Sequence, residues 1–153
     1  MGPRAARPRT HGWAAARRTR PCGRSVAAGD INVNGDGDRD GGTVIGQPVA
    51  AESGGTRPGG EISPGPGTPA GFTTAGTTTL PQDTASVPGG NESGDVLATS
   101  VSVGDHDADG CADVLAGAPG ETLTRGGTGR ADAGNAILVR GTPAGLTGSG
   151  VPR

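Results

Sequence analysis

Oxygen donors are concentrated in one short segment of the chain, residues 105–113. The segment follows the pattern D-x-D-x-D-G-x-x-D, in which positions 1, 3, 5 and 9 are Asp105, Asp107, Asp109 and Asp113 and position 7 is Cys111, whose backbone carbonyl is a further donor. Oxygens at this spacing can converge on one hard cation, and Gly110 at position 6 permits the sharp turn. Since four carboxylates repel one another unless a cation is present, the pattern predicts a calcium loop that the metal orders.

A weaker version of this pattern lies in residues 30–40, where two registers are open. One register uses Asp30, Asn32, Asn34 and Asp38, with Gly35 at the turn. The other uses Asn32, Asn34, Asp36 and Asp40, with Gly37 at the turn. The second is preferred because it brings the two loops closer to the same length and keeps an Asn-Gly-Asp-Gly turn. Either register supplies two carboxylates, which predicts weaker calcium binding than in the second loop.

Short β-strands are expected on both sides of the acidic segment. Ser100 to Val103 alternates small polar with β-branched residues, which is typical of a half-buried strand. Val114 to Ala116 is a short apolar run bounded by Asp113 and Gly117, and Ala136 to Val139 gives the strongest strand pattern in the chain. The acidic segment should therefore connect two strands of a small antiparallel sheet.

An internal repeat organises the chain. Residues 25–30 match residues 100–105, residues 46–48 match 117–119, and residues 67–72 match 141–146, with offsets of 75, 71 and 74 residues. These matches predict two copies of one unit, at residues 22–80 and 94–148, with a turn-rich linker at 81–93, an arm at 1–21 and a tail at 149–153. In the first copy Ser63 to Pro66 replaces the strongest strand, and its two prolines predict an edge strand or a loop there.

Composition and charge narrow the function classes. The 153 residues include 32 Gly and 13 Pro, which argues against a helical bundle, and no apolar stretch is long enough for a membrane span. Residues 1–24 carry seven Arg and no acid, whereas the rest is acidic. The arm is expected to be disordered, without specific nucleic-acid binding, and no signal peptide is visible in it. Cys22 and Cys111 form no CxxC pair, so a zinc site is not expected, and their disulfide state stays open.

These motifs resemble the FG-GAP repeat family, whose blades build the β-propeller of integrin α subunits and of many bacterial extracellular proteins. The resemblance rests on Ser-Val-x-x-Gly-Asp, the acidic loop, Gly-Ala-Pro at 117–119 and Gly-Thr-Pro-Ala-Gly-Leu at 141–146. The Phe-Gly pair that names the family falls at Cys22-Gly23 and at Leu97-Ala98. The resemblance implies an all-β fold, a partial β-propeller of about two blades of short antiparallel strands, in a family that closes with about seven.

The resemblance also implies what such a chain does. It implies a calcium-binding, non-catalytic repeat with an integrin-like role in extracellular or cell-surface adhesion or ligand binding. Its partners would be neighbouring propeller blades or an extracellular protein or carbohydrate. Two alternatives stay open: a companion segment of a secreted, phospholipase-like hydrolase, and a truncated remnant without function. The chain itself has no P-loop and no G-x-S-x-G elbow, so we expect no catalysis from it.

Overall fold

The regular structure of the chain is entirely β. The computed structural model describes residues 23–31, 41–48, 50–52, 55–57, 59–68, 70–73, 75 and 77–148. Within those ranges it contains eleven strands, β1 to β11, and no helix, which confirms the expected all-β class. None of the described residues belongs to a helix that could cross a bilayer. The arm at 1–21, Cys22, the weaker loop at residues 32–40 and the tail lie outside the described residues.

The second unit is built on a three-stranded antiparallel sheet. Its strands are β7 (Ser100–Gly104), β8 (Asp113–Ala118) and β11 (Asn135–Val139), in the order β11-β8-β7. All three coincide with the strands that the sequence predicts. The acidic segment is the connection between β7 and β8, so the backbone pairing of Gly104 with Asp113 holds its two ends together.

A small hairpin separates β8 from β11. Its strands β9 (Leu123–Arg125) and β10 (Thr128–Arg130) are antiparallel and pair Arg125 with Thr128. The two residues between them, Gly126 and Gly127, both have positive φ, at 59° and 77°. A two-residue turn with positive φ at both positions matches the right-handed twist of its strands, and Gly-Gly adopts it without strain.

The first unit repeats this arrangement. Its sheet has the order β1-β2-β5-β6, with β1 (Ser25–Gly29), β2 (Gly42–Gln47), β5 (Glu61–Gly65) and β6 (Leu80–Pro81). A hairpin of β3 (Ala50–Glu52) and β4 (Gly55–Arg57) again lies between the second and third strands.

The prediction for the proline-containing segment, Ser63 to Pro66, is confirmed. β5 has two neighbours only before this segment, where β6 pairs with Glu61 and Ile62. From Ser63 to Gly65 only β2 pairs with it, so Pro64 lies where β5 has one neighbour. A residue without an N–H is tolerated there because the unpartnered side needs no donor.

The registers of the two sheets coincide at the offsets found in the sequence. Ser25 pairs with Gly46 as Ser100 pairs with Gly117, at offsets of 75 and 71 residues. Gln47 pairs with Glu61 as Ala118 pairs with Asn135, at offsets of 71 and 74 residues. The sequence repeat is therefore also a repeat in backbone pairing.

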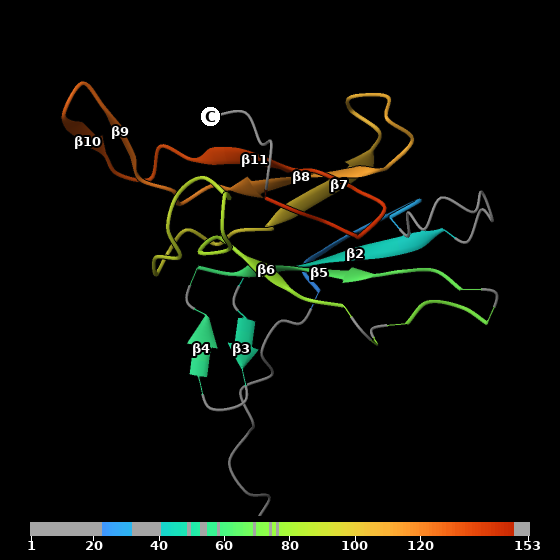
Figure 1. The fold of residues 1–153 in the computed structure, drawn as a ribbon. Helices are drawn as coiled ribbons and strands as arrows, with labels where there is room; N and C mark the ends of the chain where they lie inside the picture. The colour runs from blue at the N-terminus through green and yellow to red at the C-terminus, as the bar shows by residue number, and fades with distance from the viewer. Residues whose placement is uncertain are drawn as a thin grey trace, which may run out of the picture.

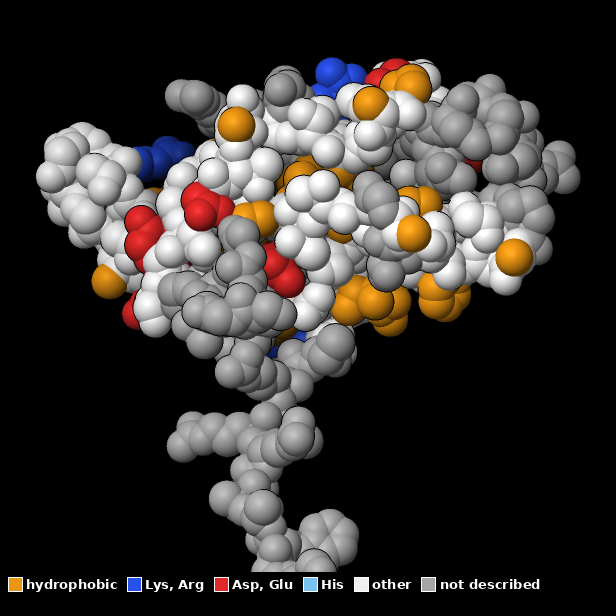
Figure 2. Space-filling model, turned by 60° about the horizontal axis from the view of Figure 1, so that its bottom comes forward, with side chains coloured by type: hydrophobic (Ala, Val, Ile, Leu, Met, Phe, Trp, Pro, Cys, Tyr) orange, Lys and Arg blue, Asp and Glu red, His pale blue; other side chains and the backbone are white. Residues whose placement is uncertain are grey.

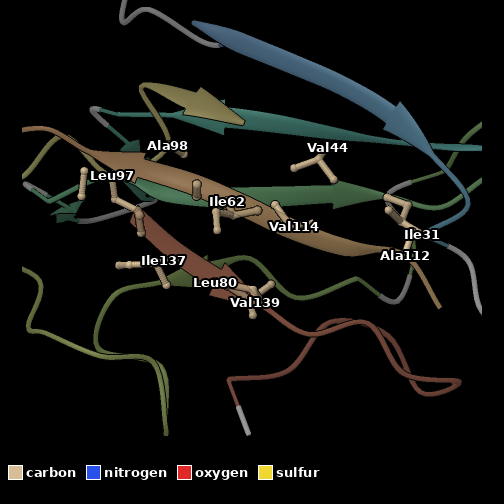
Figure 3. Packing of buried hydrophobic residues seen from close by; sticks show 12 residues of the cluster. Ile31, Val44, Ile62, Leu80, Leu97, Ala98, Ala112, Val114, Ile137 and Val139 are labelled. Carbon is tan, nitrogen blue, oxygen red and sulfur yellow. The ribbon is translucent and has the colours of Figure 1, made fainter. Parts of the chain in front are cut away.

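The two sheets form two layers that share one hydrophobic core (Figure 1, Figure 3). β1 and β2 of the first sheet contact β7 of the second. Side chains from both layers are fully buried between them, including Val44 and Ile62 from the first sheet and Val114, Ile137 and Val139 from the second. The core thus fixes the second sheet, and with it both ends of the acidic segment.

The two sheets are repeats of one another, but they pack together through opposite faces. Val44 of the first sheet is fully buried against the second, but its repeat equivalent Leu115 is 45% exposed. Val26 lies on the opposite face of the first sheet and is 68% exposed, whereas its equivalent Val101 packs against the core. Figure 2 shows hydrophobic side chains at the surface of the described part, on the side that lies lower in Figure 1. Each layer therefore leaves one face with exposed apolar side chains. The uncovered face of the first sheet carries Val26, and the uncovered face of the second is the opposite one, which carries Leu115.

Candidate metal centre

Three aspartates of the acidic segment lie together at the end of β7. Ligand oxygens of Asp105, Asp107 and Asp109 all lie within 4.8 Å of one another, and the three side chains are exposed. A calcium ion holds oxygens at about 2.4 Å, so two ligands on opposite sides of it are about 4.8 Å apart. One calcium ion fits within reach of all three carboxylates.

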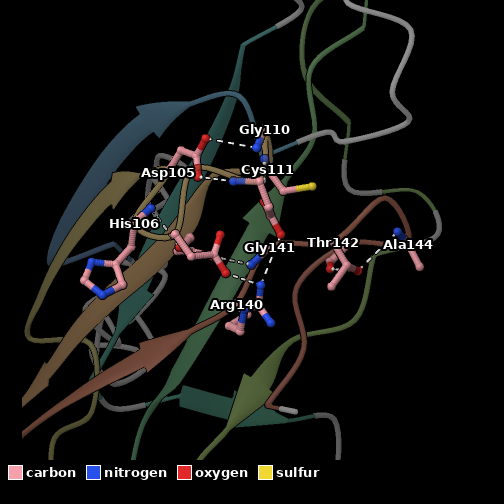
Figure 4. Close-up of polar contacts among 12 residues, drawn as sticks. Asp105, His106, Gly110, Cys111, Arg140, Gly141, Thr142 and Ala144 are labelled. Carbon is pink, nitrogen blue, oxygen red and sulfur yellow. Dashed lines mark hydrogen bonds and ion pairs between the residues drawn. The ribbon is translucent and has the colours of Figure 1, made fainter. Parts of the chain in front are cut away.

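Asp105 holds the turn of this loop together (Figure 4). Its Oδ1 accepts a hydrogen bond of 3.1 Å from the Asp109 amide, and its Oδ2 accepts one of 3.0 Å from the Gly110 amide. Gly110 has a φ of 90°, the left-handed region that glycine occupies without strain, which confirms its predicted place at the turn. The backbone thus gathers the aspartates before any ion binds.

The Asp109 carboxylate is bonded to the residue that follows the turn. Its Oδ1 accepts a hydrogen bond of 2.8 Å from the Cys111 amide, and this bond, assisted by the charge of Arg140, lowers the pKa of Asp109. The Cys111 thiol is free and buried, and burial together with the neighbouring aspartates raises its pKa. A thiol with a raised pKa remains protonated at neutral pH, so Cys111 can serve a cation through its carbonyl oxygen and not as a thiolate.

Arg140 lies over the cluster, at the end of β11 (Figure 4). Its Nη2 forms ion pairs with Asp107 Oδ2 and, at 3.1 Å, with Asp109 Oδ2. The guanidinium thus contacts two of the three carboxylates that a calcium ion would contact. Its charge partly offsets their mutual repulsion in the metal-free chain.

Asp113 occupies a different environment from the other three aspartates. It is 1% exposed, its Oδ1 accepts a hydrogen bond of 2.8 Å from the Gly141 amide, and its Oδ2 accepts one of 2.9 Å from the His106 amide. It therefore ties both the start of the loop and the end of β11 to the start of β8. The structure brings Asp105, Asp107 and Asp109 together and leaves Asp113 outside that cluster of three.

The predicted ligands of the first copy cannot be placed. Asn32, Asn34, Asp36, Asp38 and Asp40 all lie outside the described residues, in either register. Asp30 is described, and its backbone carbonyl accepts a hydrogen bond of 3.3 Å from the Ala112 amide of the second unit. The end of β1 is thereby joined to the residue just before β8.

Sequence reasoning missed Arg140 and Gly141 as partners of the acidic loop. Both directly follow the strongest predicted strand, and an antiparallel sheet places the end of β11 beside the start of β8. The position of both residues after that strand was visible in the sequence. Placing them beside the loop also required knowing that the strand pairs with β8.

The comparison with protein families agrees with this architecture. Residues 97–139 match the family model for the FG-GAP repeat. No curated protein matches the chain. The matched range holds β7 to β11, the acidic loop and the sheet that positions it. Residues 97–139 are therefore similar to an FG-GAP repeat, and the small antiparallel sheets of this all-β chain are consistent with a partial β-propeller.

Proposed function

We propose that the loop at residues 105–113 binds one calcium ion, and that the ion is structural. The observation that carries the proposal is the clustering of Asp105, Asp107 and Asp109 within 4.8 Å, in a loop closed by paired strands of an FG-GAP repeat. Three carboxylates and the Cys111 carbonyl form a set of hard oxygen donors, which suits calcium. The ion would link β7 to β8 and neutralise charges that Arg140 only partly offsets.

We propose that the chain contributes blades to an extracellular or cell-surface β-propeller with an adhesive or ligand-binding role. The support is the FG-GAP match together with the two uncovered faces. Leu115 and Leu138 lie on the uncovered face of the second sheet and line a hollow that reaches Asp105 and His106. A neighbouring blade docking there would repeat the contact that the first sheet already makes with the second.

We propose that this chain is not a catalyst. The side chains near the loop that could act as bases or nucleophiles are poorly placed for it. The imidazole of His106 points away from the carboxylates (Figure 4), and the Cys111 thiol is buried with a raised pKa. Catalysis by an acid–base group requires that it reach the reacting atoms.

A calcium titration of the whole chain by isothermal calorimetry tests the loop. The comparison is with an Asp107→Ala, Asp109→Ala double variant, and with Asp132→Asn as the control, because Asp132 is an exposed acid outside the loop and its φ of 49° suits Asn better than Ala. We expect saturable binding in the unchanged chain and in the control, and loss of the loop's share of that binding in the double variant.

Far-UV circular dichroism recorded along the same titration tests the structural role. We expect calcium to increase the strand signal of the unchanged chain, because the bound ion would stabilise the pairing of β7 with β8 at the loop. Equal calorimetric stoichiometry in the unchanged chain and the double variant would contradict the proposal.

A further inference from the structure

A second group of carboxylates lies away from the calcium loop, at the opposite end of the second sheet. Ligand oxygens of Glu92, Asp95 and Glu121 all lie within 4.8 Å of one another. Glu92 and Asp95 precede β7, and Glu121 follows β8, whereas the acidic loop joins the end of β7 to the start of β8. The two groups are therefore separated by the length of these strands.

Backbone contacts hold the second group in place. The Gly120 amide donates a hydrogen bond of 3.1 Å to the Asp95 carbonyl, and the Gly134 amide donates one of 3.0 Å to the Glu121 carbonyl. The Glu92 amide donates to Asp95 Oδ2 at 2.7 Å. The carboxylates come from two separate segments, so their convergence is a property of the folded chain.

Two of these three acids are buried with no compensating charge among the residues that the structure describes. Asp95 is 4% exposed and Glu121 is 5% exposed, and no described Arg or His forms an ion pair with any of the three. Burial, followed by the charges of Asp95 and Glu92, raises the pKa of Glu121, although the hydrogen bond from Gln82 opposes this. Buried carboxylates are normally paired with a cation or bound to a metal.

Gln82 supplies an independent indication of a ligand. Its side chain is fully buried, and its Nε2 donates to Glu121 Oε2 and, at 3.3 Å, to the Pro88 carbonyl. Its Oε1 is buried and has no hydrogen-bond partner. A buried, unpartnered amide oxygen is costly, and rotation of the amide would exchange this oxygen with the nitrogen that now faces Glu121.

Two glycines close over the same group. A Cβ at Gly89 would lie 2.2 Å from Gln82 Nε2 and 3.0 Å from Glu121 Oε1, and a Cβ at Gly90 would lie 2.7 Å from Glu92 Oε1. The backbone at both glycines thus lies close to the carboxylates and to the Gln82 amide.

We propose that Glu92, Asp95 and Glu121, together with the amide oxygen of Gln82, form a second cation site that takes a hard divalent ion such as calcium. The ion joins the segment before β7 to the turn after β8. Asn91 Oδ1 is also buried and unpartnered, but it lies beside Gly59, at 2.1 Å from where a Cβ of that residue would stand, so we do not assign it to the site. This site shares no ligand with the loop at residues 105–113, so either site can fail without the other.

The test is a calorimetric calcium titration of the whole chain in which the first loop is disabled. In the Asp107→Ala, Asp109→Ala background we expect calcium binding to remain, including one equivalent that depends on Glu121. Adding Glu121→Gln should weaken the binding of that equivalent at least about tenfold, because even the loss of an outer-shell partner costs a metal site about 10- to 100-fold in affinity. Adding Asp132→Asn, a matched neutralisation of an exposed acid, should leave it unchanged.

Thermal unfolding separates a metal ligand from a residue needed only for folding. In EDTA, Glu121→Gln should leave the midpoint of the unchanged chain unaltered or raise it, because it removes a buried like charge. Calcium should raise the unfolding midpoint of the variant by less than it raises that of the unchanged chain. Gln82→Met should likewise reduce the rise of the midpoint that calcium causes, because it removes the amide oxygen while keeping the shape of the side chain.

Two results would overturn the proposal. One is a double variant that keeps its strand signal and binds no calcium. The other is a Glu121→Gln variant that binds calcium as its background does, or whose midpoint falls equally in EDTA and in calcium.

Discussion

The aspartates of the acidic loop are held by donors that differ from one position to the next. Asp105 accepts from the backbone of the turn, Asp109 from the Cys111 amide, and Asp113 from Gly141 and His106. The spacing of acids in the sequence predicted that these side chains would converge. It could not predict which of them Arg140 pairs with, because that contact joins residues more than thirty positions apart.

Arg140→Leu tests the competition between the guanidinium and a metal ion. The substitution removes the positive charge that lies beside the Asp107 and Asp109 carboxylates, so calcium no longer competes with it. We expect calcium to bind about two- to fivefold more tightly, which corresponds to the free energy of an exposed ion pair. Calorimetry at constant ionic strength measures the change. Arg130→Leu is the matched control, since Arg130 is an exposed arginine of the hairpin. Weaker binding in Arg140→Leu than in the control would show that Arg140 supports the ion instead of competing with it.

At the scale of elements, the strands with β-branched or bulky apolar runs were predictable and the others were not. β7, β8 and β11 appear where their sequence patterns indicate. Apart from the half-buried Leu123, β9 and β10 are made of exposed residues without an apolar run, and only the Gly-Gly turn between them signals a hairpin. β5 forms despite Pro64 because backbone pairing with β2 and the burial of Ile62 outweigh its poor propensity.

Two glycines at equivalent positions of the repeat test how the layers pack. A Cβ at Gly46 would lie 2.1 Å from the Ala98 carbonyl oxygen, whereas a Cβ at Gly117 would meet only the Ser100 hydroxyl, at 2.6 Å. A clash with backbone cannot be relieved by rotating a side chain. Gly46→Ala should therefore lower the free energy of unfolding by about 1–3 kcal/mol, and Gly117→Ala should change it by less than about 0.5 kcal/mol.

Denaturant unfolding of the two alanine variants beside the unchanged chain measures these differences. If both substitutions lowered the free energy of unfolding equally, the face of the second sheet that carries Gly117 would be covered and not open. A stable Gly46→Ala variant would contradict the close packing of the two layers.

At the scale of the whole molecule, the sequence repeat predicted two similar units, and the backbone registers of the two sheets agree with its offsets. The family match covers the unit with the complete acidic loop. How the units stack could not be read from the sequence, because Val44 and Leu115 are both apolar and only the fold decides that one is buried and the other exposed. The second acidic group was missed for the same reason, since its members are ordinary acids in two separate segments.

The shared core predicts that the two units unfold together. Ile62 of the first sheet and Ile137 of the second are each 1% exposed and belong to one cluster. Ile62→Ala and Ile137→Ala should each lower the free energy of unfolding by about 2–5 kcal/mol and shift a single transition. Circular dichroism and calorimetry on the same samples measure this. Two separate transitions, of which each substitution moves only one, would show that the units are independent.

The central claim is that the loop at residues 105–113 binds calcium, and amide chemical shifts of the ¹⁵N-labelled whole chain during a calcium titration test it most directly. We predict saturable shifts of the loop amides, above all those of Asp109, Gly110 and Cys111, because these three bond to carboxylates that would bind the ion. The amides of the β9–β10 hairpin, which has no part in either proposed site, should stay in place. If the loop amides do not move at calcium concentrations that saturate calcium-binding extracellular modules, on the order of 1 mM, the account of this loop as a metal centre is wrong.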